Sequence, residues 1–385
     1  MTWEEPPQRP DRRRWLVPVG IGLAVLAALA VVILPRTSPP SMLTVGPSSP
    51  PGDGDLTNSN PQDFVPDRLP PLTTATETPG QRPLLPNTDL TIVAVDDTGL
   101  QFVDTATGDV RRVQLVDTAA ASFTETVFIV GDSIVVDANA DVVRIRDGDV
   151  RPLRIARNHR AIPTIDDTSV WVFDNFSSFV NGTASRVDFE GEVRDQIRLP
   201  AVVQPLVGTA DGLVVSAPGA ISQVATDGSA RLIARGMAVA ADNERIAWLQ
   251  CTDDLSCAVV LGTIDDPEQA RTTLDPAALP AGFFDIPVGR FSPDGRWLAL
   301  PLYRTRGRRA VEKVTVTVID TTTGVEVFRE DGSSVTGLDQ PLAWSPDSEW
   351  LMFMSRSEIH AWRAGDEGST AIDAELRGVR ALAVR

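Results

Sequence analysis

Histidine and cysteine, which supply many metal ligands and catalytic nucleophiles, are scarce in this sequence. The 385 residues include only two His, His159 and His360, and two Cys. Neither His belongs to a local motif for metal binding or nucleophilic catalysis, so we interpret both as ordinary sheet or loop residues. A Ser-His-Asp site assembled from distant segments stays open as an alternative. No metal or cofactor site is predicted.

Basic residues are also in deficit. The net charge of the chain is −17, and the region from residue 89 onward holds 28 basic and 44 acidic residues, a net charge of −16. An acidic exterior repels polyanions. Nucleic acid and anionic lipid are therefore disfavoured as partners of this region.

The sequence does contain an alternation of two kinds of turn. One kind centres on an Asp just before a hydrophobic run, at Asp132, Asp167, Asp211, Asp242, Asp294 and Asp347. The other follows a short apolar stretch, near Gly108, Gly148, Gly191, Gly228, Asp266, Gly324 and Gly365. Successive members of the second series lie 37 to 58 residues apart, which is close to the ~40–45 residues of a four-stranded propeller blade. The alternation predicts an all-β propeller in which most of these Asp residues form turns.

The segment Val314 to Ile319 indicates why such a repeat folds as a ring. Its three Val residues point to one face of a strand, and Ile319 on the other face indicates that this face is partly covered too. One blade cannot cover both of its own faces, but blades stacked around a ring cover one another. Trp recurs in the second strand of four blades, which favours packing between blades over ligand stacking. These residues are Trp171, Trp248, Trp297 and Trp350.

Ring closure is predicted from the two ends of this region. Only three strands, at about 90–95, 100–103 and 110–115, precede the blade of Asp132. Val379 to Val384 follow the seventh blade and have no further strand after them, so they can supply the missing innermost strand. This arrangement gives seven blades. It also removes the free sheet edges that invite aggregation.

Four segments carry a resemblance to known propellers. Phe291–Ala299 (FSPDGRWLA) and Trp344–Asp347 (WSPD) resemble the signature of TolB-like and WD-repeat-like propeller proteins of the bacterial cell envelope. Asp104–Gly108 (DTATG) and Asp320–Gly324 (DTTTG) are similar to the turn of quinoprotein-type propeller repeats. The resemblance covers two to four blades well and implies the propeller architecture. It implies no particular activity, because this fold hosts many functions.

The N-terminal region predicts a membrane anchor. Residues 15–34 are an uncharged 20-residue stretch, which as a helix would span ~30 Å, the thickness of a bilayer core. The preceding arginines, which keep the N-terminus cytoplasmic by the positive-inside rule, are Arg9, Arg12, Arg13 and Arg14. A cleaved signal peptide is the alternative, but the apolar run exceeds the usual ~7–15 residues and lacks a small-x-small cleavage site. We therefore expect a single-pass protein of the cell membrane with an extracytoplasmic C-terminal domain.

These observations divide the chain into four segments. Residues 1–14 are a cytoplasmic N-terminus, 15–34 a transmembrane helix, 35–88 a linker and 89–385 the seven-bladed β-propeller. The linker contains 13 prolines together with Ser, Thr and Gly. This composition is typical of an extended, unpacked chain.

Cys251 and Cys257 flank five residues between two strands of the fifth blade. Outside the cytoplasm, two Cys at the ends of one hairpin loop favour a disulfide bond. A metal pair or a redox couple is the alternative. Two thiols without a nearby His make a poor zinc site, however, and the spacing is not C-x-x-C.

One face of the ring is the candidate binding surface. Blades three, five and six are enlarged between their second and third strands, and the long connection between blades five and six emerges on the same face. Loops on a rigid scaffold often carry function. Phe residues beside clustered Arg in an acidic molecule favour a protein- or polyanion-binding surface. The candidates are Phe176, Phe179, Phe283, Phe284, Arg304, Arg306, Arg308 and Arg309. Solvated loops without a function are the alternative.

These observations favour a binding or scaffolding module at the cell envelope that recognises a protein or a cell-wall component. The competing function is an envelope glycan-acting hydrolase or lyase with carboxylates converging at the propeller axis. No catalytic signature in the sequence favours the enzyme. A carboxylate pair in a deep pocket would indicate an enzyme, and a flat face with exposed Phe and Arg would argue against one.

Overall fold

The structure is a computed structural model, and all of the residues that it describes belong to one compact unit, Ser49–Arg385. The predicted membrane segment 15–34 lies outside the described residues, and no helix within them is long and apolar enough to span a membrane. The described residues are 73–80, 83–85, 88–96, 99–114, 124–138, 141–147, 149–155, 160–174, 182–199, 203–251, 257–267, 272–274, 289–306, 310–333, 342–355, 358–372, 376 and 378–385.

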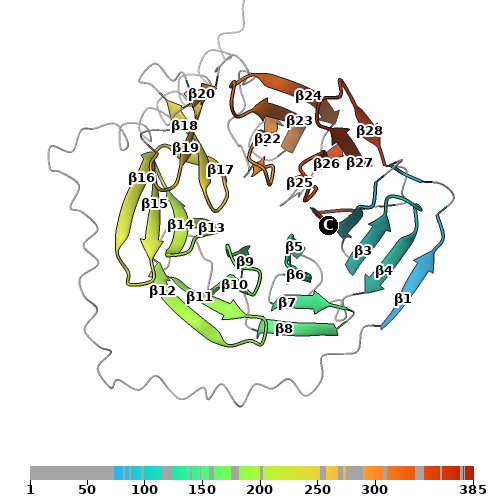
Figure 1. The fold of residues 1–385 in the computed structure, drawn as a ribbon, viewed down its shortest axis with the longest axis horizontal. Coiled ribbons are helices and arrows are strands. Elements are labelled where there is room, and N and C mark those ends of the chain that lie inside the picture. The colour runs from blue at the N-terminus through green and yellow to red at the C-terminus, as the bar shows by residue number, and fades with distance from the viewer. Residues whose placement is uncertain are drawn as a thin grey trace, which may run out of the picture. The chain divides into compact units, whose positions relative to one another are not determined.

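Seven antiparallel sheets make up this unit (Figure 1). The first has five strands in the order β1-β4-β3-β2-β29, and the others have four strands each. The first sheet comprises β1 (Thr73–Thr78), β2 (Thr91–Val95), β3 (Gly99–Asp104), β4 (Val110–Gln114) and β29 (Ala381–Val384). The second comprises β5 (Thr124–Val130), β6 (Ser133–Ala138), β7 (Asp141–Arg146) and β8 (Asp149–Ile155). The third comprises β9 (Arg160–Pro163), β10 (Ser169–Asp174), β11 (Gly182–Asp188) and β12 (Val193–Leu199).

The remaining four sheets repeat the four-stranded arrangement. The fourth comprises β13 (Gln204–Gly208), β14 (Gly212–Ala217), β15 (Ala220–Ala225) and β16 (Ala230–Arg235). The fifth comprises β17 (Met237–Ala241), β18 (Arg245–Cys251), β19 (Cys257–Thr263) and β20 (Thr272–Leu274). The sixth comprises β21 (Arg290–Phe291), β22 (Trp297–Arg306), β23 (Ala310–Asp320) and β24 (Glu326–Ser333). The seventh comprises β25 (Leu342–Trp344), β26 (Trp350–Ser355), β27 (Glu358–Arg363) and β28 (Ser369–Ala371).

The sheets close a ring. Contacts between innermost strands run from β29 through β5, β9, β13, β17, β21 and β25, and β25 contacts β29 again. The innermost strands lie toward the middle of the ring in Figure 1. This arrangement confirms the predicted all-β, seven-bladed propeller, and each sheet is one blade.

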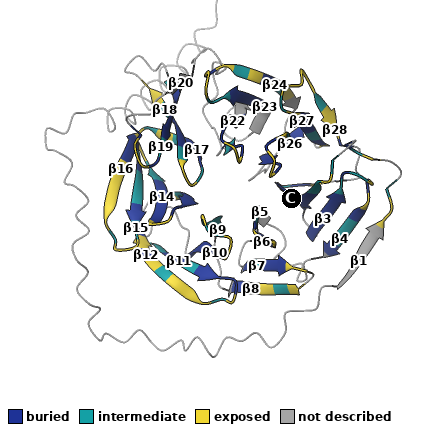
Figure 2. Cartoon of the chain, in the orientation of Figure 1, coloured by how far each residue is buried: buried dark blue, intermediate teal, exposed yellow. Residues whose placement is uncertain are grey.

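The buried apolar side chains that the structure describes form seven clusters, and each cluster lies between two neighbouring blades. β23 shows how one strand serves two clusters. Val316 and Val318 pack toward blade seven, whereas Ile319 packs toward blade five. Burial of one such side chain contributes about 1.5–3 kcal/mol. Exposed residues gather instead on outer strands such as β12 and β16 (Figure 2).

The recurrent Trp residues pack between blades, as predicted. Trp171, Trp248 and Trp297 belong to three different junction clusters and are 1%, 1% and 7% exposed. Gly208 of blade four makes room for Trp171, because a Cβ at this position would lie 2.7 Å from the Cδ1 atom of the ring. Such a separation is closer than carbon atoms can approach without displacement.

The Asp residues of the turns accept hydrogen bonds from backbone amides. At equivalent turns of blades one and six, Asp104 and Asp320 each accept two amide N–H groups through Oδ1 at 2.8–3.0 Å. Gly108 and Gly324 end these turns with φ of 79° and 72°, a conformation that glycine adopts without steric cost. We call the end of the ring that carries these turns the turn face, and the opposite end the loop face.

Turns of neighbouring blades are also linked on the turn face. The backbone N–H of Asp294 in blade six donates to Ser348 Oγ in blade seven at 3.0 Å. Burial acts to raise the pKa of Asp294, but hydrogen bonds from Ser292, the Arg296 amide and Ser348 outweigh it and lower the pKa below its usual value.

Blade three departs from the predicted turn by one residue. The carboxylate that accepts the turn hydrogen bonds there belongs to Asp166, which binds the Thr168 amide at 2.9 Å. The turn predicted from the sequence centres on Asp167 instead. Two adjacent Asp residues have the same turn propensity, so sequence alone does not distinguish them.

The predicted ring closure is confirmed. β29 pairs antiparallel with β2, with Val384 opposite Ile92 and Ala381 opposite Val95. All four residues of β29 are buried. Blade one therefore combines one strand from the end of the propeller region with strands from its beginning.

The linker ends earlier than predicted. Residues 73–78, assigned to the unpacked linker 35–88, form β1, which pairs with the outer edge of β4. Leu85 is 1% exposed and packs in the cluster between blades seven and one. The pairing of β1 uses backbone groups, so its polar Thr-rich sequence gives no alternation of apolar residues that would reveal it.

We expect removal of the closing strand to destabilise the whole ring. Deleting Ala381–Arg385 from the full chain removes the burial of Leu382 and Val384, about 3–6 kcal/mol together, and exposes an edge of β2. Calorimetry should show a lower melting temperature and a less cooperative transition. Leu382→Ala should lower the melting temperature more than Leu232→Ala, because Leu382 is 0% and Leu232 51% exposed. Equal melting of truncated and intact protein would show that closure is unnecessary.

Candidate functional site

Most of the predicted binding face lies outside the described residues. This applies to Phe176, Phe179, Phe283, Phe284, Arg308 and Arg309. The backbones of Arg304 and Arg306 lie in β22, opposite Lys313 and Ala310 of β23. These two strands have 10 and 11 residues, so blade six is enlarged partly by longer strands. Val and Thr on both strands favour continued pairing.

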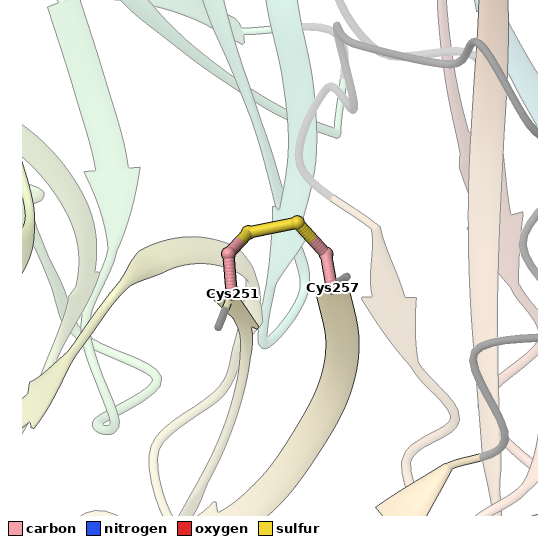
Figure 3. The surroundings of a disulfide bond; sticks show 2 residues. All are labelled: Cys251 and Cys257. Carbon is pink, nitrogen blue, oxygen red and sulfur yellow. A yellow bond between two sulfur atoms is a disulfide. The ribbon is translucent and has the colours of Figure 1, made fainter. Parts of the chain in front are cut away.

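Cys251 ends β18 and Cys257 begins β19, and the two residues lie directly opposite each other. Their Sγ atoms are bonded at 2.02 Å (Figure 3). The bond closes the end of the hairpin of blade five on the loop face. It is thus placed to restrain this hairpin.

His360 belongs to a polar cluster between blades six and seven. Its Nδ1 atom lies 2.9 Å from Glu330 Oε1 of β24 and 3.0 Å from Ser369 Oγ of β28. Ser369 Oγ also donates to Glu330 Oε2. The fold therefore brings together a Ser, a His and a carboxylate, the possibility that the sequence left open. The partner Glu330 comes from the neighbouring blade.

The geometry of this cluster differs from that of a catalytic triad. In a triad, Ser contacts one ring nitrogen of His and the carboxylate contacts the other. Here Ser369 and Glu330 both contact Nδ1, and the Ser369 hydroxyl donates to the carboxylate rather than to His. The Nε2 atom faces Glu358 at 3.9 Å. The cluster links two blades and does not activate Ser369 as a nucleophile.

No metal-binding group of three or more His, Cys, Asp or Glu side chains occurs among the residues described in the structure. The side chains of the His360 cluster already bond one another.

An open pocket of about 400 Å³, which we call the cavity of blade one, lies at the turn face. Side chains and backbone from β1, β2, β3, β4 and the end of β29 surround it. The lining residues are Thr78, Pro79, Thr91, Phe102, Asp104, Asp109, Val110, Arg111 and Arg385. This volume falls within the ~300–1,000 Å³ typical of small-molecule sites.

Strand register explains why five of these side chains face the same space. Arg385 and Thr91 exchange two backbone hydrogen bonds of 2.8 and 3.1 Å, and Thr91 lies opposite Asp104. Two positions further along the strands, Phe102 lies opposite Arg111. Opposite residues share a face of the sheet, as do residues two apart on a strand. The shared face packs on blade two, because Phe102 belongs to the cluster between blades one and two.

Two guanidinium groups lie against the ring of Phe102. The Cζ atoms of Arg111 and Arg385 are 4.5 and 5.8 Å from the ring centroid. Such cation–π contacts contribute about 0.5–2 kcal/mol each. Within the part of the chain that the structure describes, neither Arg has a carboxylate partner. No described carboxylate therefore occupies their N–H donors.

The two carboxylates of the cavity take part in local structure. Asp104 Oδ1 accepts the two turn amides described above, and Asp109 Oδ1 accepts the Gly80 N–H at 2.7 Å. A Cβ at residue 80 would lie 2.3 Å from backbone atoms of Thr107 and Gly108, so only glycine fits here. These contacts fix the chain that follows β1 against the turn of β3 and β4.

The sequence alone does not predict this cavity, which lies on the turn face rather than on the predicted binding face. One signal was present. The turn ending at Gly108 places Phe102 opposite Arg111, and the predicted closure places Arg385 beside Thr91. The two observations together indicate two Arg residues beside one aromatic ring.

The chain is similar to solved structures at low sequence identity. No protein-family model and no curated protein sequence matches the chain. Solved structures similar to it include TolB from Acinetobacter baumannii, with 14% identity, a TM-score of 0.44, and coverage of 77% of this chain and 66% of that one. AztD from Citrobacter koseri has 13% identity, a TM-score of 0.47, and coverage of 77% and 97%. A functionally unknown protein from Desulfotomaculum acetoxidans has 14% identity, a TM-score of 0.47, and coverage of 77% and 99%.

We expect the Cys251–Cys257 bond to stabilise its own hairpin rather than the ring. A loop of this size gains only about 2–3 kcal/mol in the chain-entropy model. Replacing both Cys by Ser should lower the melting temperature modestly and speed amide exchange in β18 and β19, with β14 and β15 unchanged as an internal control. Two free thiols in protein isolated from its native compartment, found by mass spectrometry, would contradict this assignment.

Proposed function

We propose that the protein is a binding module of the cell envelope, anchored by residues 15–34, which takes its partner at the cavity of blade one. The partner is an envelope protein or a cell-wall component. The observation that carries this proposal is the cavity itself, where two guanidinium groups without ion-pair partners in the described structure flank a buried aromatic ring. Convergent polar groups around an apolar floor are typical of binding sites.

Two features support an extracytoplasmic position. Arginines precede the uncharged stretch 15–34, which favours a cytoplasmic N-terminus and an external C-terminal domain. The bonded pair Cys251–Cys257 is of a kind that persists in oxidising compartments and is rare in the cytosol. The net charge of −16 after residue 88 disfavours nucleic acid as the partner.

The enzyme alternative gains no specific support from the geometry. Asp104 and Asp109 both line the cavity, but each accepts backbone hydrogen bonds that hold a turn or the chain after β1. The cavity lies in blade one, whereas the glycan-acting enzyme was predicted to place its carboxylates at the propeller axis. These contacts therefore support binding rather than catalysis.

Site-specific cross-linking in intact cells tests this proposal. A photoreactive residue at Thr78, on the rim of the cavity, should capture a discrete envelope component. The same residue at Leu232, on the outer strand of blade four, is the matched control and should not. Arg111→Gln should weaken capture from Thr78 because it removes a cavity cation. A photoreactive residue in place of Arg308 tests whether the partner binds the predicted binding face instead.

The outcomes distinguish the two faces of the ring and test the binding function itself. Capture from Arg308 but not from Thr78 would place the partner on the loop face and reject the cavity as the site. Failure of both positions to capture any component would contradict a binding function.

A further inference from the structure

We propose that the cavity of blade one recognises a zwitterionic group of the size of an amino acid or dipeptide, carried by the cell-wall component of the proposed function. This inference rests on the proposed function and names the chemistry of its ligand. The cavity presents separate positive and negative groups around one aromatic ring. A ligand that carries both charges can pair with both sets.

The positive side would hold a carboxylate. Arg111 and Arg385 come from β4 and from the end of β29, and both lie against Phe102. Because neither forms an ion pair in the described structure, their planar N–H forks can bind a carboxylate with two hydrogen bonds each. Contact with the ring reduces the number of guanidinium conformations, which lowers the entropy cost of binding.

The negative side would hold an ammonium group. Asp104 and Asp109 line the same cavity, and their described hydrogen bonds are made through Oδ1. The Oδ2 atoms can therefore accept a ligand N–H, as can the hydroxyl groups of Thr78 and Thr91. These carboxylates oppose a purely anionic ligand, and the two Arg residues oppose a purely cationic one. A zwitterion avoids both penalties.

The ring of Phe102 supplies the apolar floor. It is 6% exposed and belongs to the cluster between blades one and two, which fixes its position. An apolar side chain of the ligand can contact the part of the ring that is still exposed. The volume of about 400 Å³ suits a ligand of this size.

Calorimetric titration of the full chain in detergent micelles tests the charge pattern. The probes are L-alanyl-L-phenylalanine, its N-acetyl derivative and its C-terminal amide, which differ only in one charged end. We expect the free dipeptide to bind at least about tenfold more tightly than either derivative, because each derivative loses one charge-assisted contact. Arg111→Gln and Arg385→Gln should each weaken dipeptide binding about 10- to 100-fold.

Matched variants separate binding from folding. Arg296→Gln removes a guanidinium 4.4 Å from the Trp297 ring in blade six, and it should leave dipeptide binding unchanged. Arg385→Gln retains the backbone bonds to Thr91, so its melting temperature should stay close to that of the unmodified chain. If Arg385→Gln nevertheless unfolds, Arg111→Gln tests the same carboxylate contact from β4.

Three results would overturn the inference. The first is that either derivative binds as tightly as the free dipeptide. The second is that the dipeptide does not bind at about 10 mM. The third is that Arg296→Gln and Arg111→Gln reduce dipeptide affinity equally. If the dipeptide fails while Thr78 still captures a partner in cells, the ligand class is wrong and the binding function stands. If Thr78 and Arg308 both capture nothing, the binding function itself fails.

Discussion

Each blade of this propeller depends on both neighbours to bury its two faces, because its apolar residues alternate between them. Val316 and Val318 of β23 pack toward one neighbour, and Ile319 packs toward the other. Seven clusters of this kind account for the described core, one at each junction. A ring left open would expose two such faces at once. The pairing of β29 with β2 is therefore the contact on which the other junctions depend.

The same closure creates the cavity of blade one. Arg385 follows the closing strand, whereas Phe102 and Arg111 lie on strands from the start of the propeller region. The three side chains meet only when β29 is in register with β2. Gly80 and Asp109 then hold the chain after β1 at the rim. Residues from both ends of the propeller thus form one site, which couples binding at this site to the integrity of the ring.

Much of the fold could be predicted from sequence because turn residues and the alternation of apolar residues along a strand are local signals. The Asp and Gly turns predicted the blades. The segment 379–384, which has no further strand after it, predicted the ring closure. β1 was missed because the Thr-rich segment pairs through its backbone and shows no apolar alternation. The contact of His360 with Glu330 depends on the approach of two blades, which no local pattern records. The cavity was missed because its residues occur in five separate segments of the chain.

Hydrogen exchange at the closing strand tests this account most directly. The amides of Thr91 and Arg385 each donate to the other residue's carbonyl oxygen, and the Arg380 amide donates to Val95. If closure holds the ring, the amides that join β29 to β2 should exchange only through global unfolding, as slowly as those of the buried pair β14 and β15. Exchange of the β29 amides at the rate of a frayed terminus, with β14 and β15 still protected, would contradict the account.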